Sequence, residues 1–116
     1  MHILVAEENV DMRETIKSVL SAIPATFHQC GNGRNAIREY VRLQPDWVVM
    51  DIRMPGLDGL RATEIIKAFD PAAKVVLITD YDDAAFRAEA ARLHADGYVL
   101  KENLADVREI IKQAKQ

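Results

Sequence analysis

Acidic residues, a hydroxyl and an ammonium group directly follow the most apolar runs of this sequence. The polar residues that come after these runs are Glu7 and Glu8, Asp51, Thr79 and Asp80, and Lys101. Carboxylates that lie close together repel one another and raise one another's pKa unless a cation is bound among them. Such oxygen ligands favour Mg²⁺, which takes one or two carboxylates, water molecules and a phosphate oxygen. With Lys101 as a positive charge and Thr79 as a hydroxyl donor, the set could stabilise a phosphoryl group in transfer.

Asp51 is the natural nucleophile of this set, because carboxylates form acyl phosphates and Asp51 follows the run that we expect at the centre of a sheet. A polar residue after a single apolar run has an ordinary explanation, since loops often begin with Asp or Thr. Four runs that each end in a chemically complementary group favour a common site.

The runs themselves predict strands. Residues 3–6, 47–50, 75–78 and, more weakly, 97–100 are continuously apolar and rich in β-branched side chains, which is typical of strands covered on both faces. The segment 26–30 alternates between polar and apolar residues and is better interpreted as an edge strand.

Helical spacing of apolar residues separates these strands. The predicted helices carry their apolar residues over 12–23, 36–43, 60–69, roughly 82–94, and 104–114. Pro24 ends the first of these helices, and Asn103 is the predicted N-cap of the last.

The resulting order is a strand followed by a helix, five times over. Buried strands that alternate with amphipathic helices predict an α/β fold, in which a parallel sheet has helices on both faces. In this architecture ligands bind beyond the carboxyl ends of the strands, where the polar residues above are expected to lie.

Length and composition fit one small domain over residues 1–116. The formal net charge of −3 argues against nucleic-acid binding through backbone phosphates. Cys30 is the single cysteine and is expected to be a small hydrophobe in a strand and not a reactive thiol. Without a signal-peptide pattern or an apolar run of roughly 18 residues, the sequence predicts a cytoplasmic protein that does not enter the membrane.

Three segments together resemble the receiver domain of two-component response regulators, along essentially the whole chain. The segment 48–59 resembles the phosphoacceptor motif, in which the Asp is followed by x-x-M-P-x-x-[DN]-G. Residues 77–79 resemble the threonine site, and 95–101 the lysine motif with an aromatic residue, Tyr98, three positions before the lysine. The absence of a proline after Lys101 resembles receivers attached to LuxR-type helix-turn-helix regulators.

The resemblance implies a flavodoxin-like doubly wound sheet in the order 2-1-3-4-5 and a regulatory phosphoacceptor that catalyses only its own phosphorylation and dephosphorylation. Asp51 would take the phosphoryl group and Lys101 would pair with its oxygens. The Mg²⁺ cofactor would be held by Glu8 and Asp51, by Glu7 through water, and by the backbone carbonyl of Arg53.

The resemblance also implies a switch and a set of partners. Thr79 would turn toward the phosphate and Tyr98 would move inward, which would change a surface made by the fourth helix, the fifth strand and the fifth helix. The donor would be a sensor histidine kinase or a phosphotransfer protein. A DNA-binding domain beyond this chain and a homodimer formed on phosphorylation are compatible with the same resemblance, while the domain itself would not bind nucleic acid.

Two residues depart from the family pattern. The second acid is usually Asp, and Glu8 is one methylene longer, which bears on octahedral Mg²⁺ geometry. The residue after the threonine is usually Ala or Gly, and Asp80 adds bulk and like charge where the phosphodonor arrives; we expect it to slow phosphorylation or to select the donor. Arg53 and Tyr81 are expected to tune the lifetime of the phosphorylated state, in a direction that the sequence leaves open.

Two other functions compete with this interpretation. Glu8 and Asp80 suggest an atypical receiver that acts as a phosphorylation-independent interaction module. A phosphatase with an aspartyl nucleophile is disfavoured, because Arg53 stands where that family's second Asp would be. His2, His28 and His94 share no metal-ligand spacing and are interpreted as surface or strand-edge residues.

Overall fold

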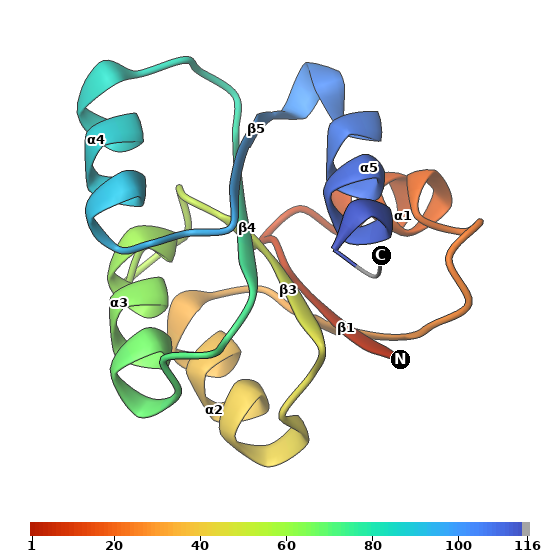
Figure 1. The fold of residues 1–116 in the computed structure, drawn as a ribbon, viewed down its shortest axis with the longest axis horizontal. Coiled ribbons are helices and arrows are strands. Elements are labelled where there is room, and N and C mark those ends of the chain that lie inside the picture. The colour runs from red at the N-terminus through yellow and green to blue at the C-terminus, as the bar shows by residue number, and fades with distance from the viewer. Residues whose placement is uncertain (115–116) are drawn as a thin grey trace.

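A computed structural model describes residues 1–114, and they form one parallel sheet between two layers of helices (Figure 1). The strands are β1 (His2–Ala6), β2 (Thr26–Cys30), β3 (Trp47–Asp51), β4 (Val75–Thr79) and β5 (Gly97–Leu100). The helices are α1 (Val10–Val19), α2 (Gly33–Leu43), α3 (Gly59–Phe69), α4 (Ala84–Arg92), the 3₁₀ turn η1 (Lys101–Asn103) and α5 (Ala105–Gln113). All neighbouring strands are parallel, in the order β2-β1-β3-β4-β5, so the predicted fold is confirmed.

The strands β1, β3 and β4 lack polar alternation because both of their faces are covered. Leu4, Val48 and Leu77 belong to a core under α2, α3 and α4, whereas Ile3, Val49 and Val76 belong to a second core under α1 and α5. Figure 1 shows these two groups of helices on opposite sides of the sheet. β2 lies at the edge, as its alternating sequence predicts.

The ends of two helices differ from the predicted ends. α1 stops at Val19, and the turns that follow it still bury Leu20 and Ile23 before Pro24. α4 is shorter than 82–94, because the Asp83 side chain caps its start and the left-handed residue His94 (φ 59°) follows its end.

The predicted cap of the last helix is wrong. Asn103 lies within η1, and α5 begins at Ala105 without a side-chain cap. Two residues predicted to be on core-facing stripes are also exposed, Val41 by 46% and Phe69 by 53%. Val41 follows the buried Tyr40 by one position, or about 100° around the helix, and this rotation points it toward solvent.

The connection from β3 to α3 packs closely because two glycines lack a side chain. A Cβ atom at Gly59 would lie 2.0 Å from the Asp51 carbonyl oxygen, and one at Gly33 would lie 2.3 Å from the Leu57 carbonyl oxygen. The Gly59 amide also donates to the Ile52 carbonyl at 2.7 Å. The start of α3 therefore rests directly on the end of β3. No helix formed by residues 1–114 is both long and apolar enough to cross a membrane.

Gly59→Ala should lower the free energy of unfolding by about 1–3 kcal/mol, because backbone must move to admit the methyl group. Urea denaturation followed by circular dichroism measures this loss. Gly31→Ala is the matched control, since its nearest neighbour would be an ordinary 3.8 Å away. Equal effects of the two substitutions would contradict this account of the β3–α3 connection.

Candidate functional site

Lys101 joins the carboxylates that follow the strands. Its Nζ atom lies 2.7 Å from Glu7 Oε1, 3.2 Å from Asp51 Oδ2 and 3.9 Å from Asp80 Oδ2. Burial alone would lower the pKa of Lys101, but hydrogen bonding and charge from Glu7 and Asp51 outweigh it and raise this pKa above its usual value. Lys101 is therefore a firmly charged ammonium group, brought to the site because β5 ends at Leu100.

Asp51 is the last residue of the central strand β3, and its side chain is only 5% exposed. Burial, followed by the negative charge of Glu7, raises the pKa of Asp51 to about 6, although Lys101 opposes the shift. The Arg53 amide donates to Asp51 Oδ1 at 3.3 Å. The carboxylate is thus held in place but poorly compensated, which makes it receptive to a cation.

Glu7 is buried beside Asp51 and is held by the start of α1. The Asn9 amide donates to Glu7 Oε2 at 3.0 Å, while the Asn9 side chain accepts from the Met12 amide and caps the helix. Glu7 Oε1 forms an ion pair with Lys101 but accepts no well-directed hydrogen bond. Sequence reasoning missed Asn9, although an asparagine before a helical run is a recognisable N-cap signal.

These side chains line an open pocket of about 430 Å³. Its lining residues are Glu7, Glu8, Asn9, Asp51, Arg53, Asp80 and Lys101. Four carboxylates thus face two cationic side chains. Glu8 lies exposed at the rim, and Asp80, with 60% of its side chain exposed, faces Lys101 from the end of β4.

The pocket fits a hard divalent cation. It is rich in carboxylate oxygens, and it contains one buried oxygen, Glu7 Oε1, that lacks a directed donor. The part of the chain that the structure describes contains no preformed cluster of three His, Cys, Asp or Glu ligands. Mg²⁺ does not require one, since it usually keeps several water ligands and binds through one or two carboxylates.

The predicted switch residues lie on β4 and β5, outside the lining of this pocket. Thr79 is buried at the end of β4 and accepts a long 3.5 Å hydrogen bond from the Tyr81 amide. The half-buried Tyr98 donates its hydroxyl to the Tyr81 carbonyl at 3.2 Å and accepts from the Asp83 amide at 3.4 Å. Tyr98 is therefore tied to the β4–α4 connection.

The predicted tuning residues Arg53 and Tyr81 contact each other. The Arg53 guanidinium carbon lies 5.7 Å from the centre of the Tyr81 ring and 5.9 Å from that of Phe86, within the range of cation–π contacts. Phe86 belongs to α4 and was not singled out from the sequence, because nothing in its spacing marks it as a neighbour of residue 53. A second pocket, of about 420 Å³, adjoins this cluster and includes Glu8, Arg53 and Phe86.

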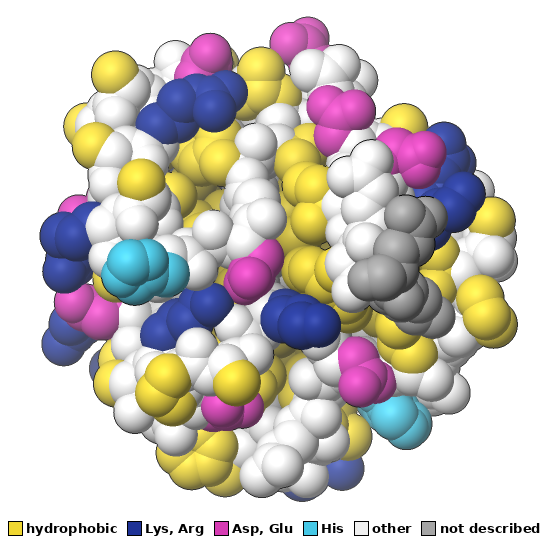
Figure 2. Space-filling model, in the orientation of Figure 1, with side chains coloured by type: hydrophobic (Ala, Val, Ile, Leu, Met, Phe, Trp, Pro, Cys, Tyr) yellow, Lys and Arg dark blue, Asp and Glu magenta, His cyan; other side chains and the backbone are white. Residues whose placement is uncertain are grey.

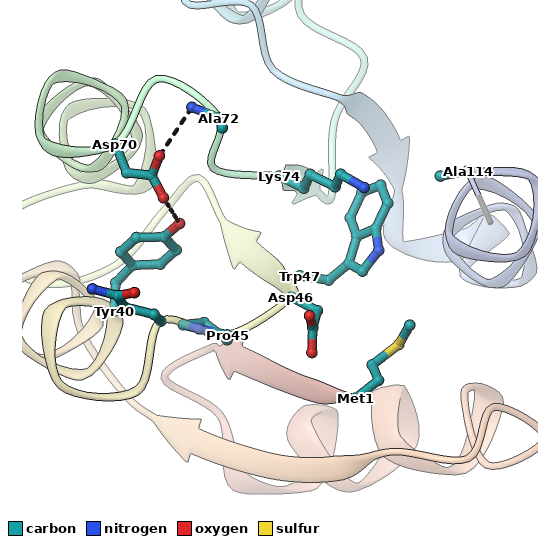
Figure 3. A pocket seen from close by; sticks show the side chains of 10 residues that line it. Met1, Tyr40, Pro45, Asp46, Trp47, Asp70, Ala72, Lys74 and Ala114 are labelled. Carbon is teal, nitrogen blue, oxygen red and sulfur yellow. Dashed lines mark hydrogen bonds between the residues drawn. The ribbon is translucent and has the colours of Figure 1, made fainter.

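The pocket in Figure 3 lies at the opposite, amino-terminal ends of the strands. There the Tyr40 hydroxyl donates to Asp70 at 2.6 Å, and the Lys74 ammonium lies 5.4 Å from the centre of the Trp47 indole. This pocket contains none of the predicted site residues. Trp47 is only 3% exposed and packs in the core under α1 and α5.

With this geometry in view, comparison with known proteins identifies the class. Residues 3–114 match the family described as the response regulator receiver domain. The chain therefore belongs to this family, and the resemblance inferred from its motifs is confirmed.

Individual relatives span several kinds of regulator. The chain is 36% identical over 109 residues to the transcriptional regulatory protein LnrK of Bacillus subtilis. This match covers 90% of the chain but only 48% of LnrK. The crystal structure of a LuxR-family response regulator from Aurantimonas sp. SI85-9A1 matches with a TM-score of 0.90 and 29% identity over 97% of this chain and 83% of that one.

A third match concerns the fold alone. The crystal structure of a CheX-CheY-BeF₃-Mg²⁺ complex from Borrelia burgdorferi has a TM-score of 0.91 and 19% identity, and the match covers 100% of this chain and 90% of that one. The same arrangement of strands and helices thus occurs in regulators with different names and lengths.

Without divalent metal, ionisation of Asp51 should destabilise the native protein. Because the native pKa is near 6 and the ordinary value is 3.8, the native state binds more protons than the unfolded state between these values, and stability falls as pH rises. In Asp51→Asn this decrease in the free energy of unfolding should be smaller by roughly 1–2 kcal/mol. The figure allows for the screening of the Asp51 charge by solvent in the open pocket. Urea denaturation from about pH 4 to 7 with a chelator measures it, and parallel profiles for both proteins would contradict it.

Proposed function

We propose that the chain is a phosphoacceptor switch, which receives a phosphoryl group on Asp51 from a sensor histidine kinase or a phosphotransfer protein. The observation that carries this proposal is the Asp51 carboxylate, held 3.2 Å from a buried ammonium group in an open acidic pocket at the end of the central strand. Family membership supports the same reaction class.

The chemistry requires one bond to form and one to break. An Asp51 oxygen attacks the phosphorus of a phosphohistidine, the P–N bond breaks, and the imidazole leaves with its electron pair. Lys101 offsets negative charge on the phosphoryl oxygens without changing its own protonation, which its raised pKa favours. The chain would catalyse only its own phosphorylation and dephosphorylation, and would not be a general enzyme.

Mg²⁺ would be held by Glu8 and Asp51, with Glu7 acting through water and Arg53 through its backbone carbonyl. When bound, the ion would neutralise charge on the carboxylates and on the phosphoryl group. The poorly compensated Asp51 and the undirected Glu7 oxygen support this assignment. Glu8 at the rim has the additional methylene that a longer reach requires.

The output would be carried by the surface of α4, β5 and α5. A phosphoryl group would draw in the Thr79 hydroxyl, and Tyr98 would leave its contacts with the β4–α4 connection and move inward. Since the chain spans about half of LnrK, we infer that a longer regulator could carry a DNA-binding domain after it, with transcription as the output and dimerisation as the response to phosphorylation.

The first test is direct detection of phosphate. Incubation with acetyl phosphate and Mg²⁺ should add one phosphoryl group. Chemical reduction of the acyl phosphate marks the modified carboxylate, and mass spectrometry of the resulting peptides should locate it at Asp51. Asp51→Asn should remain unmodified, and Lys101→Ala should react on the order of 10²-fold more slowly because the charge on the oxygens is no longer offset.

Asp58→Asn is the matched control, since Asp58 is an acid of the same motif that caps α3 instead of lining the Lys101 pocket. It should still be labelled on Asp51. An unmodified parent protein, with both acetyl phosphate and a phosphorylated kinase domain, would favour the interaction module that acts without phosphorylation. The observation that favours this second function is that Glu7 and Asp80 already pair with the Lys101 ammonium group, which a phosphoryl group would otherwise engage.

Asp80 should slow the reaction. Its carboxylate lies at the pocket mouth, where like charge opposes an incoming phosphodonor, although its exposure and its proximity to Lys101 weaken the effect. Asp80→Ala should accelerate labelling by acetyl phosphate several-fold, corresponding to about 1 kcal/mol. Asp80→Asn keeps the size and removes the charge, so an acceleration confined to Asp80→Ala would assign the effect to bulk. Unchanged rates in both variants would contradict a role for Asp80.

A further inference from the structure

Two histidines that lie far apart in the sequence meet at the edge of the sheet. His2 opens β1 and His28 lies in β2, and their Nδ1 and Nε2 atoms are 3.0 Å apart. The rings are stacked, with centroids 5.2 Å apart and an angle of 30° between their planes. The register pairs His2 with Thr26 and Leu4 with His28, so both histidines project from the same face of the sheet.

The backbone under both rings is held firmly. The His2 amide donates to the Asp46 carboxylate at 2.7 Å, and the Thr26 amide donates to the Met1 carbonyl at 2.8 Å. One of the histidine patches in Figure 2 lies near the N-terminus marked in Figure 1, which is where β1 begins. His2 is exposed and His28 is half-buried, and both rings are carried by paired strands and not by a loop.

We propose that His2 and His28 chelate a borderline divalent transition ion, Zn²⁺, Cu²⁺ or Ni²⁺, at the β1–β2 edge. Neutral imidazole is a preferred ligand of these ions. With metal–nitrogen bonds of about 2.0–2.1 Å, two nitrogens on one ion lie about 2.9 Å apart at a right angle and about 3.3 Å apart at the tetrahedral angle. The observed 3.0 Å is within this range, so the two nitrogens can bind one ion if both rings rotate to aim at it and give up their mutual hydrogen bond.

Two carboxylates lie near the histidines, and the exposed His2 opens the site to solvent. Asp46 brings a carboxylate to the His2 backbone, and Glu39 lies within electrostatic range of His28, although the lowered pKa of Glu39 comes mostly from its hydrogen bond with Arg42. Within residues 1–114 no third His, Cys, Asp or Glu joins the pair as a ligand. Water would complete the coordination, and the affinity would be lower than that of a four-ligand structural zinc site.

This site is separate from the Asp51 pocket and independent of its function. His2 begins the strand whose other end leads to Glu7, and neither histidine lines the Lys101 pocket. A bound ion would link β1 to the edge strand β2 and would stabilise the native chain by mass action.

The test is titration of the full chain with ZnCl₂ in saturating Mg²⁺, which occupies hard oxygen sites, followed by NMR of the histidine ring nitrogens and by thermal denaturation. Ring signals of both His2 and His28 should shift together, and the denaturation temperature should rise. His2→Gln and His28→Gln should each weaken binding at least tenfold and abolish the coupled shift.

His94→Asn is the matched control, since His94 is exposed and its left-handed backbone conformation accepts asparagine. It should leave Zn²⁺ binding unchanged. Circular dichroism without metal checks that the exposed substitutions leave the fold intact. Shifts confined to one ring, no shift at all, or equal losses in His28→Gln and His94→Asn would each overturn the chelate.

Discussion

The arrangement of the site depends on one buried ammonium group among carboxylates. The side chain of Lys101 is 12% exposed and lies within 4 Å of Glu7, Asp51 and Asp80, which lie at the ends of three different strands. A buried charge is tolerated only when it is paired, so loss of Lys101 would leave acids repelling one another at the end of the sheet. The parallel register matters here because it brings the ends of β1, β3 and β4 to the same edge.

The same cluster is incompletely neutralised, and this incompleteness is what gives the pocket its chemistry. One ammonium group faces three nearby carboxylates, so Asp51 has a raised pKa and Glu7 keeps an oxygen without a directed donor. A fully compensated network would be more stable, but it would attract a cation less strongly. The pocket therefore combines a rigid floor, formed by strand ends, with negative charge that the protein does not fully neutralise.

The helices around the pocket differ in how firmly they are attached. α3 buries Gly59, Ala62, Thr63 and Ile66 and begins directly against the Asp51 carbonyl, whereas Ala90 is the only buried residue within α4. Polar contacts of Tyr98 and stacking of Arg53 on Phe86 supply much of the connection between α4 and the site. Because these contacts are local and partly exposed, α4 can rearrange at lower cost than α3.

The sequence alone predicts the strands, their order of burial and the position of the pocket, because burial of a strand leaves a recognisable pattern of apolar residues along the chain. Continuous apolar runs marked strands covered on both faces, the alternating segment marked the edge strand, and the residues after the runs marked the carboxyl-end pocket. Asp51 and Lys101, fifty positions apart, could be brought together only through motif resemblance and the expected parallel order.

Tertiary structure decided the features that depend on register, on rotation around a helix, and on competition between caps. It placed Asp80 beside Lys101, stacked Arg53 on a ring from α4, exposed Val41 and Phe69, and began α5 at Ala105 instead of after an Asn103 cap. It also brought His2 within hydrogen-bond distance of His28, although their spacing in the chain suggests no relationship. Such contacts join residues whose local sequences carry no information about each other, so only the packed sheet determines their distance.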